Sequence, residues 1–260
     1  VAQAKGVSPL VPGNAAHPQA QAIAQSLLGG ERKAILLGNA AAHHAKASSL
    51  LALANWIAQH TGATVGFLGE AANTVGAQLV GALPSNGGLN AAQMSKPGAL
   101  KAALLLNTEP GADSAHGTEG LAQCDMVITL SPFKTNLDIS DVLLPISPFT
   151  ETAGTFVNTE GRAQSFHGVV RPLGETRPGW KVLRVLGTML GLPGFAYETI
   201  EEVRAAALPA DIASRLSNAS SAYVEVAPSA SPVTASIYQL DGLVRRAPSL
   251  QATADAAGGA

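Results

Sequence analysis

The chain has 260 residues, enough for one large domain or two small ones, and its 16 Lys and Arg residues against 18 Asp and Glu residues give a formal charge of −2. A domain of this size buries about three-quarters of the surface that its unfolded chain exposes, so a core can form without covalent staples. The chain has no block of basic residues and few aromatic residues, which argues against nucleic acid as a partner.

Cysteine usage narrows the class of protein further. Cys124 is the only cysteine, which excludes an internal disulfide framework and an iron–sulfur cluster held by this chain's own thiolates. We therefore expect a reducing compartment. The chain starts with Val1 and shows no basic segment followed by an apolar one, so we expect a piece of a longer protein without a signal peptide. Its apolar runs fall short of the roughly 20 residues of a spanning helix, so we expect a soluble chain with no direct membrane insertion.

In chain order, the first 30 residues predict an entering linker and a helix at 18–28, with Pro18 in its first turn and Gly29 at its end. From there, short apolar runs alternate with segments of helical spacing. The apolar runs predict strands at 34–37, 64–68, 103–106, 126–130 and 142–144. The helical segments lie at 45–60, 97–102, 114–123, 178–190 and 199–208. The Gly- and Asn-rich segment 69–88 is expected to be a long loop.

The alternation of strands and helices predicts an α/β fold with a doubly wound, mostly parallel sheet. The five runs are continuously apolar, which is typical of strands covered by helices on both faces. We divide the chain into a linker and helix (1–30), an α/β domain (31–216), and a linker with an extended C-terminal tail (217–260). The segment 217–232 is rich in Ser, Ala and Pro, and signals of order return at 237–250.

The segment 141–164 begins with the fifth strand and then predicts a polar hairpin. Gly154 and Gly161 permit turns on either side of the apolar pair Phe156 and Val157. We expect these apolar residues to fix the hairpin while its polar residues (Asn158, Glu160, Arg162 and Gln164) bond to loops at the strand ends. The Arg162 guanidinium could tie two carbonyl-ended loops together, or bind a carboxylate such as that of Glu151 or Glu160. The alternative is that these polar groups only satisfy the backbone.

Ligands in an open parallel sheet bind beyond the carboxyl ends of the strands. Glycine and asparagine at such turns let the backbone approach a phosphate or nucleotide, and lysine or threonine can add a donor. The candidate pocket residues are Gly38, Asn39, Asn107, Glu109, Lys134 and Thr135. The alternative is that these residues only make turns, because the chain has no G-x-G-x-x-G motif and no P-loop.

Other side chains give no convincing site. Adjacent residues on a helix face different ways, and His43 and His44 lack further ligands at metal-binding spacing, so we predict no metal. Glu151 and Glu160 have no partner histidine, and capping or salt bridging is the commoner role of such loop carboxylates. Asp113 with Ser114 and His116 forms a local cluster without the geometry of a triad. Cys124 is expected to be a small buried apolar residue, and no catalytic residue is assigned.

Four segments together carry a resemblance to a known family: 107–110, 133–135, 141–145 and 151–164. Their order resembles that of the molybdopterin oxidoreductase superfamily, and the Glu, Gly-Thr, Asn, Glu-Gly-Arg, Gln pattern of 151–164 is the most specific part. Within that superfamily, the segments 70–77 and 244–251 resemble the large iron–sulfur subunit of bacterial NADH-quinone oxidoreductases, respiratory complex I.

The resemblance implies a C-terminal piece of such a subunit, with a Rossmann-like fold that acts as a scaffold or assembly domain. It implies iron–sulfur clusters in a cysteine-rich N-terminal region outside this sequence, and no molybdenum or pterin in this one. The implied partners are the other subunits of the complex I peripheral arm, on the cytoplasmic side of the bacterial inner membrane. Two alternatives stay open: a fragment of an active molybdopterin-dependent oxidoreductase, and an unrelated nucleotide-binding dehydrogenase suggested by the fold alone.

Overall fold

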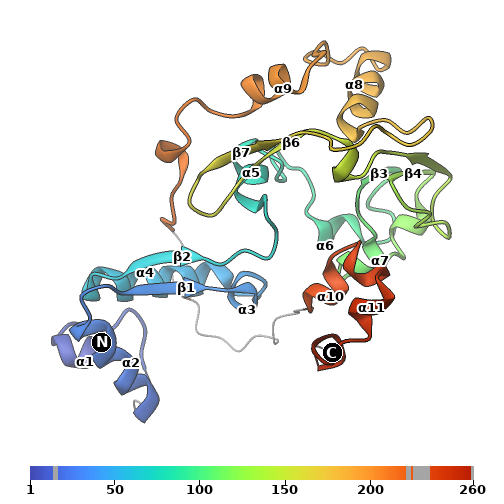
Figure 1. Cartoon of the computed structure of the whole chain (residues 1–260). Helices are drawn as coiled ribbons and strands as arrows, with labels where there is room; N and C mark the ends of the chain where they lie inside the picture. Colours follow the sequence, from blue (N-terminus) through green and yellow to red (C-terminus); the bar gives the residue numbers. More distant parts are fainter. Residues whose placement is uncertain (14–16, 221–223, 225–234, 259–260) are drawn as a thin grey trace.

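The structure is a computed structural model that describes residues 1–13, 17–220, 224 and 235–258 (Figure 1). The chain opens with α1 (Ala2–Lys5) and α2 (Pro18–Gly29). Pro18 occupies the first turn of α2, and the ring of His17 accepts a hydrogen bond from the backbone N–H of Gln19 at 3.3 Å. The helix predicted at 18–28 is therefore confirmed, with a start set by proline and a side-chain cap.

A βαβ unit follows. The strands β1 (Ala34–Leu37) and β2 (Thr64–Phe67) pair in parallel, and α3 (Asn39–Ala42) and α4 (Ala47–Thr61) connect them. Helix α4 ends at Gly62, whose φ of 76° lies in the left-handed region that glycine adopts without strain. The strand, loop, helix and strand predicted for this part of the chain are confirmed.

A second parallel sheet holds the other three predicted strands, in the order β3 (Ala102–Leu106), β4 (Met126–Ser131) and β5 (Val142–Pro145). Its core is built from Leu105, Leu121 and Val127, with the half-buried Cys124 packed against them. The central strand β4 is the most deeply buried, and Leu130 is fully buried within it. Cys124 packs against the apolar core as predicted, but it is half-buried instead of buried.

The arrangement of the strands differs from the prediction in two ways. All five runs pair in parallel, but they form two sheets instead of one. Several of their side chains are also uncovered, since Leu36 is 56% exposed and Leu104 is 42% exposed. In the second sheet the connections leave the strands partly uncovered, because the β3 to β4 link contains only α7 (Pro110–Asp113) and the 3-10 turn η1 (Leu121–Gln123), and the β4 to β5 link contains no helix.

Three local predictions were wrong. The helix expected at 114–123 is a loop that ends in η1, because Ser114 is extended and Gly117 adopts a left-handed φ of 70°. The helical turn expected at 97–102 is a tight turn at 97–98, where Gly98 adopts a left-handed φ of 73°, and the helix of this region is α6 (Ala91–Met94), which begins at a capping box between Asn90 and Gln93. The loop expected at 69–88 contains α5 (Thr74–Leu79).

The predicted hairpin is present as the antiparallel pair β6 (Gly154–Val157) and β7 (Ala163–Phe166), after the short turn η2 (Phe149–Glu151). The rings of Phe156 and Phe166 meet edge to face at 5.0 Å. The helices α8 (Gly179–Met189) and α9 (Ile200–Ala207) follow, close to the predicted 178–190 and 199–208. In Figure 1 the hairpin lies beside α5.

The remaining chain runs through η3 (Ala213–Arg215) to the C-terminal segment, and most of the predicted linker at 217–232 lies outside the described residues. The C-terminal segment contains α10 (Ile237–Leu240), η4 (Val244–Arg246), α11 (Pro248–Gln251) and α12 (Ala254–Gly258). It returns to lie against α7 (Figure 1). No helix in the described part of the chain is long and apolar enough to cross a membrane.

Candidate functional site

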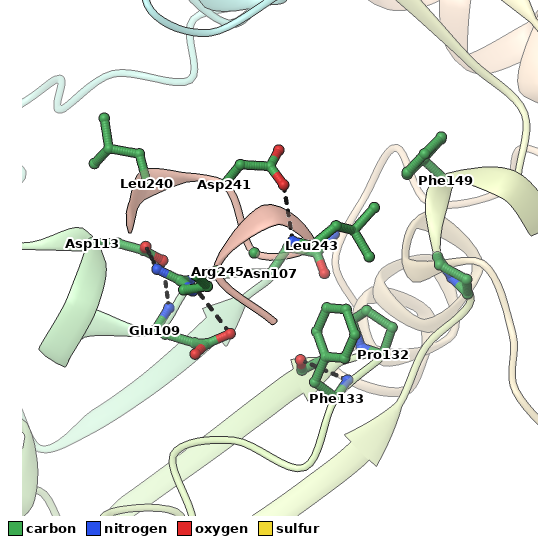
Figure 2. A pocket seen from close by; sticks show the side chains of 13 residues that line it. Asn107, Glu109, Asp113, Pro132, Phe133, Phe149, Leu240, Asp241, Leu243 and Arg245 are labelled. Carbon is green, nitrogen blue, oxygen red and sulfur yellow. Dashed lines mark hydrogen bonds and ion pairs between the residues drawn. The ribbon is translucent and has the colours of Figure 1, made fainter. Parts of the chain in front are cut away.

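A cavity of about 260 Å³ lies beyond the carboxyl ends of β3, β4 and β5, where the C-terminal segment meets the second sheet (Figure 2). This is the edge at which a parallel sheet binds ligands. The wall combines carboxylates, apolar rings and one guanidinium. Its residues are Asn107, Glu109, Asp113, Ser131, Pro132, Phe133, Pro148, Phe149, Leu240, Asp241, Gly242, Leu243 and Arg245.

The turn after β3 shapes the acidic side of the cavity. Asn107 adopts a left-handed φ of 51°, which turns the chain sharply, and its N–H donates to the carbonyl of Leu130 at 2.9 Å. The Asp113 carboxylate then accepts the N–H of Glu109 at 2.7 Å and the hydroxyl of Thr108 at 3.4 Å. These bonds hold the Glu109 and Asp113 side chains next to each other at the carboxyl edge of the sheet.

The loop after β4 is tied to the same turn. Asn136 has a left-handed φ of 55°, and its side-chain amide donates to the carbonyl of Thr108 at 2.9 Å. The same amide lies 3.4 Å from the hydroxyl of Thr129, a fully buried residue whose hydroxyl is 2.7 Å from that of Ser140. This polar network fixes the two strand-end loops relative to each other, because each buried polar group in it has a partner.

Two arginines of the C-terminal segment bind the two carboxylates. Arg245 Nη1 lies 2.8 Å from Asp113 Oδ1, and Arg245 Nη2 lies 3.4 Å from Glu109 Oε1. Arg246 Nη2 lies 2.7 Å from the same Glu109 oxygen, and its guanidinium carbon lies over the Phe133 ring, 4.2 Å from the ring centroid. Figure 2 shows Arg245 reaching between Asp113 and Glu109.

The C-terminal segment is folded so that it presents these arginines. The Asp241 carboxylate accepts the backbone N–H groups of Leu243 and Val244, each at 2.9 Å, and so starts the turn that carries them. Each arginine also donates to a carbonyl of its own segment, Arg245 to Gln239 at 3.0 Å and Arg246 to Gly242 at 2.9 Å. The amide of Gln251 closes the segment by donating to the carbonyls of Tyr238 and Val244.

The electrostatics of Arg245 follow from this setting. Burial by itself lowers the pKa of the Arg245 guanidinium, but the hydrogen bond and charge of Asp113 and the charge and hydrogen bond of Glu109 outweigh it, so the pKa is raised above its ordinary value. The side chain of Arg245 is only 13% exposed, and that of Glu109 is 18% exposed. Water screens such a pair less than it screens a fully exposed one.

The structure separates the six residues predicted for the pocket. Asn107 and Glu109 line the cavity. Gly38 and Asn39 lie at the end of β1, in the other sheet, where Gly38 precedes the first residue of α3. Lys134 and Thr135 follow β4 in sequence but are not part of the cavity wall, and Lys134 is exposed. Sequence reasoning missed the pairing of Asp113 with Arg245, for which the only signal was the adjacent pair of arginines in an otherwise weakly charged tail.

The hairpin makes a second link between distant segments. Its buried residue Val157 donates its backbone N–H to Asn73 Oδ1 at 2.9 Å, which joins β6 to the turn before α5. The Arg204 guanidinium donates to the Ser165 hydroxyl at 2.7 Å and so attaches α9 to β7.

The role predicted for the Arg162 guanidinium was wrong: Arg162 is exposed, and within the described chain no bond from its guanidinium to a loop or carboxylate is found. The hairpin turn instead depends on Asn158, whose side-chain oxygen accepts the N–H groups of Glu160 at 3.0 Å and Arg162 at 2.9 Å.

The other titratable residues take local roles. His43 Nε2 lies 2.8 Å from Glu70 Oε1 and connects the end of α3 to the loop after β2. Glu151 accepts the N–H of Leu173 at 3.1 Å, which agrees with the capping role expected for it. Across the described residues, no group of three or more His, Cys, Asp or Glu side chains is placed to hold a metal ion.

A match to a known family shows which family the chain belongs to. The profile of the molybdopterin oxidoreductase family matches residues 14–189. The chain belongs to the molybdopterin oxidoreductase family. This confirms the resemblance that the segments between 107 and 164 indicated.

Several curated relatives match shorter parts of this molybdopterin oxidoreductase-family chain. A putative formate dehydrogenase of Staphylococcus aureus is 40% identical over 26% of the chain and 7% of its own length. The 78 kDa subunit of mitochondrial NADH-ubiquinone oxidoreductase from Candida albicans is 43% identical over 25% of the chain and 9% of its own length. A probable oxidoreductase of Bacillus subtilis is 44% identical over 24% of the chain and 6% of its own length. Each match therefore spans less than a tenth of the relative.

The family name implies a molybdopterin cofactor, and the cavity does not fit one as it stands. Its volume of about 260 Å³ is below the roughly 300–1,000 Å³ of ligand pockets. Among the described residues that line it, Arg245 is the only cation, and both ends of its guanidinium are bound to Asp113 and Glu109. Phosphate groups would meet these two carboxylates without an available positive charge to balance them.

Proposed function

We propose that this chain is a scaffold and assembly domain of the large iron–sulfur subunit of an NADH-quinone oxidoreductase. In this role it supports electron transfer from NADH to quinone without binding a redox centre itself. The observation that carries the proposal is the occupation of the strand-end site by the chain's own Arg245 and Arg246, which leaves the carboxylates of Glu109 and Asp113 bound to protein groups. The similarity to the 78 kDa subunit of NADH-ubiquinone oxidoreductase supports the same function.

The proposal extends to cofactors and partners. Iron–sulfur clusters would reside in a cysteine-rich part of the subunit other than this segment, which has only Cys124. Neither molybdenum nor pterin would bind here. The partners would be other subunits of the peripheral arm, on the cytoplasmic side of the bacterial inner membrane, and the domain would contact them without entering the membrane and without binding nucleic acid.

A second function is favoured by the similarity to the putative formate dehydrogenase of Staphylococcus aureus. In that case the chain would be part of an active molybdopterin-dependent oxidoreductase, and the arginines would have to leave Glu109 and Asp113 before a cofactor could enter. The nucleotide-binding dehydrogenase suggested by the fold alone has no comparable observation in its favour.

The cofactor content of the purified full-length subunit separates the two functions. Molybdenum is measured by elemental analysis, and pterin by the fluorescence of its oxidised form after denaturation. Iron without molybdenum or pterin, in a preparation that assembles into an active NADH-quinone oxidoreductase, is the expected result. Molybdenum and pterin at one per chain would overturn the scaffold function and establish the alternative.

A further inference from the structure

The contact between the C-terminal segment and the end of β3 has the chemistry of a recognition site. Asp113 and Arg245 lie 132 residues apart in sequence, and Glu109 and Arg246 lie 137 residues apart. The acceptors are two adjacent carboxylates and the face of an aromatic ring, and both ligand groups are guanidiniums. Local hydrogen bonds position the two carboxylates in the turn after β3, and other local hydrogen bonds position the two arginines in the C-terminal segment.

Guanidinium geometry matches this site in a way that an ammonium cannot. Arg245 uses one terminal nitrogen for Asp113 and the other for Glu109, so its planar fork spans both carboxylates. Arg246 binds the same Oε1 atom of Glu109, and its guanidinium lies over the Phe133 ring. A lysine carries one compact charge on a flexible stem and cannot make both contacts of either arginine at once.

We propose that Glu109, Asp113 and Phe133 form a binding site for a pair of adjacent arginine side chains, and that the chain's own C-terminal segment is its resident ligand. The chemical class that the site accepts is a diarginine peptide. The inference stands apart from the proposed function, since it concerns a contact within this chain and does not depend on the redox chemistry of the whole protein.

The alternative is that these are ordinary surface salt bridges, which contribute little to stability. Two observations oppose it. The side chains of Arg245 and Glu109 are largely buried, at 13% and 18% exposed. Three ion pairs share one cluster, so that ordering one side chain orders its neighbours.

Covalent attachment has a measurable consequence for the site. A tethered segment acts at a high effective concentration, so a free peptide of the same sequence competes poorly with it. Replacing Arg245 and Arg246 by alanine in the full chain weakens the resident ligand and leaves Glu109, Asp113 and Phe133 unchanged. The site should then accept a diarginine peptide added from solution.

The test uses a fluorescent peptide with the sequence of residues 236–252 and measures its anisotropy on titration with the full chain. We expect the Arg245→Ala/Arg246→Ala chain to bind the peptide about tenfold or more tightly than the wild-type chain. A chain with the exposed Arg171 replaced by alanine is the matched control and should bind like wild type. A peptide with both arginines replaced by lysine should lose most of the binding.

Two further variants make the result decisive. Adding Glu109→Gln and Asp113→Asn to the double-alanine chain should abolish peptide binding, with circular dichroism showing that the chain is still folded. In the full chain, Arg246→Glu alone should increase hydrogen exchange at 237–251, because it places a carboxylate against Glu109. Equal peptide binding with and without the two carboxylates, or no peptide binding by the double-alanine chain, would overturn the proposal.

Discussion

The side-chain oxygen of Asn73 accepts the backbone N–H of Val157 at 2.9 Å, across 84 residues of sequence. Val157 is 1% exposed, so this N–H has no access to water in the folded chain. One side chain from the turn before α5 thus completes the hydrogen bonding of a strand in the hairpin. Both segments were singled out in the sequence, and the structure places them in contact.

Replacing Asn73 by alanine should lower the free energy of unfolding by about 1–3 kcal/mol, because it leaves the buried N–H of Val157 without an acceptor. Asn73→Asp is the matched control, since it keeps an acceptor oxygen at the same position, and it should retain more of the stability. Urea denaturation of the three proteins measures the difference. Equal midpoints for Asn73→Ala and wild type would show that the bond contributes nothing.

Arg245→Lys should destabilise the chain by about 1–3 kcal/mol, because an ammonium cannot bind Asp113 and Glu109 together and one charged partner loses its hydrogen bond. Arg246→Lys should cost less, since Arg246 forms one ion pair and is more exposed, at 32%. Thermal melting of both variants gives the order of stability. A larger loss for Arg246→Lys would contradict the bridging role of Arg245.

The hairpin turn gives a prediction about Asn158 and Arg162. Asn158→Ala should destabilise by about 1 kcal/mol or more, since its oxygen accepts two backbone N–H groups of the turn. Arg162→Ala should stay within about 0.5 kcal/mol of wild type, because it is an exposed side chain away from such features. Chemical denaturation checks both. A strongly destabilised Arg162→Ala chain would support the earlier prediction that the Arg162 guanidinium binds neighbouring loops or a carboxylate.

The core of the second sheet is tested by two leucines. Leu130 in β4 is fully buried, whereas Leu137 in the following loop is 65% exposed. Leu130→Ala should lower the free energy of unfolding by about 2–5 kcal/mol through lost burial and a new cavity. Leu137→Ala removes the same atoms and should change it by no more than about 0.5 kcal/mol. Similar losses for the two variants would mean that β4 is not the centre of the core.

The positions of the strands could be predicted because the signal for each is local. Each of β1 to β5 is a short apolar run that ends near glycine, proline or asparagine, and all five pair in parallel as expected. The helix predicted at 114–123 failed because Gly117 takes a left-handed φ of 70°, a backbone conformation that interrupts a helix and that apolar spacing does not encode. The division into two sheets likewise depends on how the connections pack, which apolar periodicity does not encode.

Only the part of the candidate site that directly follows a strand could be predicted from the sequence. Asn107 and Glu109 follow a strand directly, so the rule for ligands at strand ends points to them. The groups that complete the site come from Asp113, on the next short helix, and from Arg245, 132 residues later. No local pattern specifies such a pairing. Gly38 and Asn39 satisfied the same strand-end rule but belong to the other sheet.

The long separation of Asp113 and Arg245 also sets an order of events during synthesis. The parallel pairing of β3 and β4 joins residues 24 apart in sequence, such as Ala102 and Met126, whereas the arginine contact closes a loop of 132 residues. Ribosomes add roughly 5–20 residues each second, so the second sheet can form several seconds before Arg245 exists. For that interval the nascent chain displays Glu109 and Asp113 uncovered, and we expect the docking of the C-terminal segment to be the last step in folding of the α/β region.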